Sequence, residues 1–300
     1  MKIGLSIYSL RDAIEKGMTT VEAIEWIADN GGEHMEVVSF VTDLVGKDEL
    51  IAEIREASIR TGVALSAYCL PGDVLDISPS EYEAEIQRIK AHIDTANQLG
   101  ITVVRHDLSS YTRTAAENII ENYDRDLPIL VKACQELADY AAQYNMITTV
   151  ENHGRYINGG DRVRRLMLAV DRPNFKCMLD IGNSLCVDED PLVCMETLLP
   201  FAAAVHFKDF YIRKDKHLIG DGKWLETIHK NYLRGAIVGH GEIEVQRIMG
   251  CIKDYGYDGN VTIEFEGMED CFVGSKIGMD NVRRLAGSKS GAVPEPVQHL

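Results

Sequence analysis

The chain has 300 residues, of which 45% are hydrophobic and 26% are charged, and its formal net charge is −16. This composition is that of an ordinary globular domain with a sizeable core. The acidic balance argues against a nucleic-acid-binding protein and against a protein that binds anionic membranes, because both need a basic face.

Compartment and redox state are indicated by what the sequence lacks. No apolar run reaches the roughly 18 residues that a transmembrane helix requires, and the first residues show no signal-peptide pattern. The seven cysteines are scattered, without a Cys-x-x-Cys pair. An odd, scattered set is typical of reduced core thiols rather than of a disulfide framework. We therefore expect a soluble, cytoplasmic protein that does not associate with membranes.

Eight short, mostly apolar runs rich in β-branched residues recur along the chain and predict strands. Such runs are typical of parallel strands that are buried on both faces. They are Lys2–Ile7, Met35–Val38, Val63–Ala67, Ile101–Arg105, Met146–Glu151, Phe175–Asp180, Ala202–Phe207 and Asn260–Glu264.

Between these runs the apolar residues follow a helical period. Val163, Leu166, Met167 and Val170 make one such stripe, and glycines stand just before several of the expected strands, where helices commonly end. Eight strand–helix units in 300 residues predict a single-domain (β/α)₈ TIM barrel. A doubly wound sheet would place a Gly-x-Gly-x-x-Gly motif after the first strand, and none is there.

The expected barrel covers residues 1–287, and two of its connections are long. One runs over Asp107–Tyr123. The other, at 209–241, joins strand 7 to helix 7. Long connections at the carboxyl ends of barrel strands are typical of lids. Residues 288–300 are expected to form a loosely attached C-terminal tail.

Charged side chains end several of the otherwise apolar strands. In a barrel, residues at the carboxyl ends of the strands face the active site. Four of these positions carry a group that can bind a metal: Glu151, Asp180, His206 and Glu264. Because ionised groups in a barrel mouth need partners, one divalent cation would satisfy all four. Three carboxylates and one imidazole suit Mn²⁺, Mg²⁺, Co²⁺ or Zn²⁺ alike.

Four short motifs carry a resemblance to a known family. They are Val-Glu-Asn-His-Gly at 150–154, Leu-Asp-Ile-Gly-Asn at 179–183, Val-His-Phe-Lys-Asp at 205–209 and Ile-Glu-Phe-Glu at 263–266. Their order resembles the xylose isomerase-like barrel superfamily, and in particular its sugar isomerase/epimerase branch. Gly-His-Gly-Glu-Ile at 239–243 also resembles an element of that branch. The resemblance spans roughly residues 2–286.

The resemblance implies roles for individual residues. Glu151, Asp180, His206 and Glu264 would hold one divalent metal, and Glu151 and Glu264 would also form the acid/base pair. His153 and Lys208 would contact the substrate.

Three further positions are candidates for substrate binding. Glu36 and His106 end the second and fourth strands, where each could contact substrate or serve as a satisfied core residue. Asn183 stands where ketose 3-epimerases and the apurinic endonucleases of this superfamily usually carry histidine. This departure weakens the match to both of those groups.

These features favour a metal-dependent isomerase or epimerase of a small sugar or related polyhydroxy carbonyl compound, acting through an enediolate. A dehydratase of an inosose- or dehydroshikimate-like substrate would use the same residues. A non-catalytic sugar-binding barrel is the remaining alternative. The sequence leaves open whether the chain forms a homo-oligomer.

Overall fold

Eight parallel strands close into a barrel in the computed structural model, which describes residues 1–109, 113–114 and 116–287. The strand order around the ring is β1-β11-β7-β6-β5-β4-β3-β2. The strands are β1 Lys2–Ser6, β2 His34–Val38, β3 Ala64–Leu70, β4 Val103–His106, β5 Ile147–Glu151, β6 Phe175–Asp180, β7 Ala202–Phe207 and β11 Asn260–Ile263. Each of the eight predicted runs lies on one barrel strand, so the predicted TIM barrel is confirmed.

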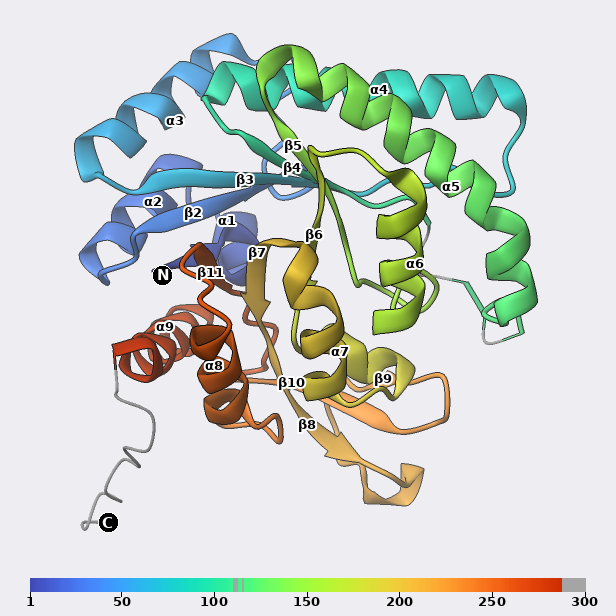
Figure 1. Cartoon of the computed structure of the whole chain (residues 1–300). Coiled ribbons are helices and arrows are strands. Elements are labelled where there is room, and N and C mark those ends of the chain that lie inside the picture. Colours follow the sequence, from blue (N-terminus) through green and yellow to red (C-terminus); the bar gives the residue numbers. More distant parts are fainter. Residues whose placement is uncertain (110–112, 115, 288–300) are drawn as a thin grey trace.

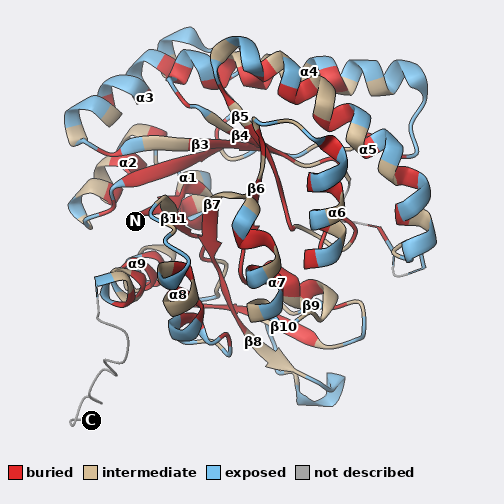
Figure 2. Ribbon diagram, viewed as in Figure 1, coloured by how far each residue is buried: buried red, intermediate tan, exposed pale blue. Residues whose placement is uncertain are grey.

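Helices cover the outside of this barrel (Figure 1). The α-helices are α1 Arg11–Glu15, α2 Thr20–Asp29, α3 Asp48–Thr61, α4 Pro79–Leu99, α5 Ile120–Ala141, α6 Gly160–Val170, α7 Pro191–Leu198, α8 Val245–Asp254 and α9 Cys271–Gly287. Short 3₁₀ helices are η1 Ile7–Leu10, η2 Ala142–Tyr144, η3 Asn183–Val187, η4 Leu199–Phe201 and η5 Lys216–Leu218. The predicted stripe on α6 is confirmed, because Val163, Leu166, Met167 and Val170 are all buried. Figure 2 shows the resulting division, with buried strands inside and the exposed faces of the helices outside.

Local sequence signals set the ends of helix α4. The Ser78 hydroxyl accepts a hydrogen bond from the backbone N–H of Glu81, and the Glu81 carboxylate accepts one from the N–H of Ser78. This reciprocal capping box satisfies two N–H groups that the helix itself cannot bond. At the other end the chain turns at Gly100 with φ +77°, a conformation that glycine adopts without a Cβ clash.

The connection at 209–241 contains a small sheet that the sequence analysis did not anticipate. Strands β8 Asp209–Arg213, β10 Tyr232–Ala236 and β9 Leu225–Glu226 pair antiparallel in the order β8-β10-β9. In Figure 1, β8 and β10 extend away from the barrel beside α7 and α8. We call residues 209–241 the β-insertion.

Asp209 joins the two ends of the β-insertion. Its carboxylate accepts hydrogen bonds from the backbone N–H groups of Phe210, Gly239, Gly241 and Ile243, at 2.8 to 3.2 Å. A Cβ at Gly241 would overlap this carboxylate. The close approach of the backbone to a buried carboxylate therefore explains Gly241, whereas Gly239 has φ +92°, a conformation that favours glycine.

Two other expectations from the sequence can be compared with the structure. All seven cysteines are free thiols. Among the described residues, no helix combines the length and apolarity needed to span a membrane. The expected tail, 288–300, and part of the connection Asp107–Tyr123 lie outside the described residues.

Candidate active site

The four candidate metal ligands meet at the carboxyl end of the barrel. One ligand atom from each of Glu151, Asp180, His206 and Glu264 lies within 4.8 Å of the others, and all four residues are buried. They come from the ends of β5, β6 and β7 and from the position just after β11. These four strands are neighbours in the closed sheet, so their carboxyl ends bring the side chains together.

The donor set fits a divalent metal ion. Oδ2 of Asp180 and Nδ1 of His206 are buried and have no hydrogen-bond partner among the described residues. Nδ1 of His206 lies 3.7 to 4.0 Å from carboxylate oxygens of Glu151, Asp180 and Glu264. Burial, and the charges of Glu151 and Glu264, raise the pKa of the Asp180 carboxyl above its usual range even though Lys208 opposes this. A cation bound among these atoms would satisfy the orphaned atoms and offset the repulsion between the carboxylates.

Glu36 lies behind His206 and is fully buried. Its carboxylate is 2.9 to 3.0 Å from Nε2 of His206, and it accepts a hydrogen bond of 2.9 Å from the Thr262 hydroxyl. Glu36 also lines the main cavity. Its carboxylate is thus engaged by two protein side chains, which favours the core role that the sequence left open beside a substrate contact.

Arg105 is a site residue that the sequence analysis missed. Its guanidinium bridges Oε2 of Glu151, at 2.8 Å, and Oδ2 of Asp107, at 2.9 Å. Only 7% of Arg105 is exposed. An arginine inside the otherwise apolar run 101–105 was the signal, because an unpaired charge is rarely buried in a strand. Asn183 supports the same glutamate, donating a hydrogen bond of 2.9 Å from Nδ2 to Oε1 of Glu151.

Lys208 supports the other candidate base. Its Nζ lies 2.7 Å from Oε2 of Glu264 and 3.3 Å from Oε1 of Glu266, and it donates to Oδ1 of Asn183 at 3.2 Å. Burial opposes the charge on Lys208, but the carboxylates of Glu264 and Glu266 outweigh it and raise the pKa of the ammonium. Glu151 and Glu264 therefore each have a buried cation of their own.

The two candidate histidines outside the metal cluster differ in position. His153 lines the main cavity, and its Nδ1 lies 3.3 Å from Oδ2 of Asp107. His106 is fully buried and lines another, small cavity together with Leu108, Ile157 and three residues of the site, which are Asp107, Glu151 and His153. Successive residues of a strand face opposite sides, so His106 is turned away from the barrel interior that Arg105 faces. Of the two roles that the sequence leaves open for His106, this position favours a core residue over a substrate contact.

The main cavity has a volume of about 510 Å³ and opens at the carboxyl ends of the strands. Buried charged residues, including His206, Lys208 and Glu264, line its inner end. Its outer end includes the exposed Phe40 and, from the β-insertion, Trp224 and Leu225. The cavity therefore combines a charged end at the metal-ligand cluster with an aromatic rim.

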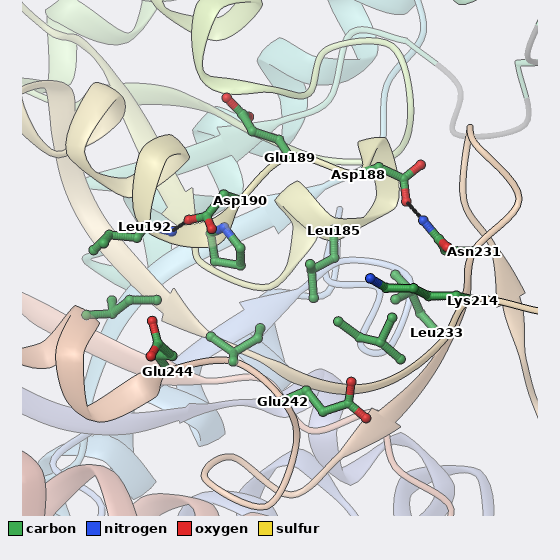
Figure 3. A pocket seen from close by; sticks show the side chains of 14 residues that line it. Leu185, Asp188, Glu189, Asp190, Leu192, Lys214, Asn231, Leu233, Glu242 and Glu244 are labelled. Atoms are coloured by element: carbon green, nitrogen blue, oxygen red, sulfur yellow. Dashed lines mark hydrogen bonds between the residues drawn. The ribbon is translucent and has the colours of Figure 1, made fainter.

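A second cavity, of about 380 Å³, lies between η3, the start of α7, the β-insertion and the start of α8 (Figure 3). Carboxylates surround an apolar floor, but each has a partner within the protein. Asp188 accepts a hydrogen bond from Asn231, Asp190 caps α7, and Glu242 pairs with Arg213. None of the candidate site residues lines this cavity.

Fold and site together define a TIM barrel with a buried cluster of three carboxylates and one histidine at its carboxyl face, and this cluster could hold a metal ion. The family model described as xylose isomerase-like TIM barrel matches residues 24–286. The chain belongs to this family.

Individual relatives within the superfamily differ in activity. An inosose dehydratase from Lacticaseibacillus casei is 26% identical over 144 residues, a match that spans 46% of this chain and 46% of that protein. The structure of a probable 3-DHS dehydratase from Bacillus anthracis has a TM-score of 0.72 at 16% identity, and covers 94% of this chain and 99% of its own. A D-psicose 3-epimerase from Clostridium cellulolyticum H10 has a TM-score of 0.71 at 16% identity, with 95% and 99% covered. At these identities the two structures show a shared fold.

Proposed function

We propose that the protein is a divalent-metal-dependent isomerase or epimerase of a small sugar or related polyhydroxy carbonyl compound. The observation that supports this most is the placement of two carboxylates on either side of the cluster. Glu151 ends β5 and Glu264 follows β11, and the strands β6 and β7 lie between these two strands in the ring. Two bases on different walls allow a proton to be removed from one face of a substrate and returned to the other.

The residues around each base support this role. Burial opposes ionisation of Glu264, but Lys208 and His206 outweigh it and hold the pKa of Glu264 well below its usual range. Arg105 holds the Glu151 carboxylate in position through an ion pair of 2.8 Å. His153 and Lys208 line the same cavity and would contact the hydroxyl groups of the substrate. A metal ion held by Glu151, Asp180, His206 and Glu264 would supply a Lewis acid that polarises the carbonyl and stabilises the enediolate.

A dehydratase is the second candidate, favoured by the pairing of Asp107 with His153. The carboxylate of Asp107 lies against Nδ1 of His153, which leaves Nε2 of this ring to protonate a departing hydroxyl group. The 26% identity with an inosose dehydratase over 144 residues is consistent with this reaction. A non-catalytic sugar-binding barrel agrees less well with a site in which both candidate bases are present and paired with cations.

One screen separates these functions. The metal-loaded protein is incubated in deuterated water with ketoses, inososes and dehydroshikimate, and the products are analysed by mass spectrometry. A product isomeric with its substrate that carries solvent deuterium supports the isomerase or epimerase. A product lighter by one water supports the dehydratase. Ligand binding without either product would support the sugar-binding barrel.

A further inference from the structure

We propose that the outer end of the main cavity is a subsite for a second ring, so that the substrate is a glycoside rather than a free monosaccharide. The inner end would hold the reacting sugar, and in this respect the inference rests on the proposed function. Three features of the outer end support a second ring there: its aromatic side chains, its size and the residues that the β-insertion contributes to it.

Aromatic side chains from two distant parts of the chain line this end of the cavity. Tyr8 and Phe40 follow β1 and β2, whereas Phe210 and Trp224 belong to the β-insertion. Phe40 is 61% exposed although it is a large apolar residue. An exposed aromatic ring at the rim of a cavity is typical of a ligand contact. The C–H faces of sugar rings are apolar and pack on such surfaces.

Tyr8 is held in place by its neighbours. Its ring packs edge-on against Phe40 with ring centroids 5.6 Å apart. The guanidinium of Arg11 lies 4.4 Å from the centre of the Tyr8 ring, and Arg11 also donates a hydrogen bond to its hydroxyl. These contacts fix the ring before any ligand arrives, which lowers the entropy cost of binding.

Trp224 is positioned by contacts within the β-insertion. Its Nε1 donates a hydrogen bond of 3.0 Å to the carbonyl of Gly220, and the guanidinium groups of Arg213 and Arg234 lie 5.9 and 5.4 Å from its ring. The ring is half-buried and lines the cavity. The contacts of Asp209 with Gly241 and Ile243 hold the two ends of the β-insertion, which carries Trp224, together at one place on the barrel.

The size of the cavity agrees with a substrate of two rings. Its volume of about 510 Å³ lies within the range of about 300–1,000 Å³ that is typical of sites for drug-sized ligands, which are larger than a single sugar ring. The metal-ligand cluster would hold the first ring at the charged inner end. The remaining space adjoins the aromatic rim. A second ring joined through a glycosidic bond would fill this space and contact Phe40 and Trp224.

Binding measurements test the subsite without relying on turnover. Affinities of the metal-loaded protein for glucose and for phenyl β-glucoside are measured by calorimetry. We expect the glucoside to bind about tenfold more tightly, the effect of stacking on aromatic side chains. In Phe40→Ala and Trp224→Ala the ratio of the two affinities should fall toward one. Tyr255→Ala removes an aromatic side chain that is 56% exposed on the outside of the barrel, and should keep the wild-type ratio.

Three outcomes would overturn the subsite. They are equal affinities for the two ligands in the wild type, a preference that survives in both variants, and binding of neither ligand. Failure of the proposed function can be distinguished from failure of the subsite. A preference that depends on Phe40 and Trp224, together with no product when glycosides of the same keto sugars are added to the screen described above, would reject the isomerase and leave the subsite in place.

Discussion

Oε2 of Glu36 lies 2.9 Å from Nε2 of His206, and this contact leaves Nδ1 of the same ring facing the three carboxylates of the cluster. The Thr262 hydroxyl holds the Glu36 carboxylate from the other side. A carboxylate on the outer nitrogen of a histidine fixes the orientation of the ring and increases the basicity of the inner nitrogen. Glu36 is thus a positioning residue for the candidate metal site.

The first prediction concerns Glu36. In Glu36→Gln the His206 ring loses a charged partner, and affinity for Mn²⁺ should fall about 10–100-fold, the usual effect of removing such a support. Calorimetric titration of the metal-free protein measures this directly. Glu56→Gln, which changes an exposed glutamate on α3, should bind Mn²⁺ as the wild type does. Equal affinities in the two variants would contradict the positioning role.

The second prediction concerns metal content. The purified protein should contain about one divalent ion per chain, because four buried ligand groups converge on one point. Treatment with a chelator should abolish activity, and Mn²⁺, Mg²⁺ or Co²⁺ should restore it. Elemental analysis by mass spectrometry gives the stoichiometry. A fully active preparation without bound metal would refute the metal site.

The third prediction concerns the two candidate bases. Glu151→Gln and Glu264→Gln should each lower activity about 10²–10⁴-fold even at saturating metal, the usual contribution of a positioned acid or base. In a two-base epimerase, one variant should still exchange the substrate α-proton with solvent deuterium without forming product. In a dehydratase only one of the two glutamates removes the substrate α-proton, so the variant of the other glutamate should still exchange this proton with solvent deuterium. Full activity of both variants at saturating metal would exclude the acid/base assignment.

The fourth prediction concerns His106 and stability at acid pH. Burial lowers the pKa of His106 from 6.5 to about 4. Between these values the unfolded chain binds more protons than the folded protein, so stability is lost as the pH falls from 6.5 toward 4. This group alone should remove about 2 kcal/mol of the free energy of unfolding between pH 7 and pH 5, since one pKa unit corresponds to about 1.4 kcal/mol.

Urea unfolding at pH 7 and at pH 5 measures that loss. His106→Asn removes the titrating group and should show a correspondingly smaller decrease in the free energy of unfolding. His240→Asn, which changes an exposed histidine, should decrease as the wild type does. If His106→Asn loses as much stability as the wild type between the two pH values, His106 is not a buried neutral histidine.

The sequence by itself determined the barrel and the cluster at the carboxyl end of its strands. Each strand is marked by its own apolar run, and helices are marked by their stripes, caps and terminal glycines, all of which are local signals. In a closed parallel sheet the carboxyl ends of all strands lie at one end. For this reason Glu151, Asp180, His206 and Glu264 could be expected to meet although they are spread over more than 100 residues of sequence.

Only the tertiary structure decided what each polar group contacts within that end of the barrel. Glu36 and His206 are 170 residues apart, and their contact depends on closure of the sheet and on the register of its strands. The pairing of β4 with β5 likewise brings Arg105 to Glu151, a contact of 2.8 Å across two neighbouring strands. The antiparallel pairing of β8, β10 and β9 within the β-insertion brings Trp224 to the cavity, and the local pattern of apolar residues does not specify this pairing. Such contacts depend on angles and distances accumulated over the whole fold, whereas the apolar period of a strand or helix depends on a few neighbouring residues.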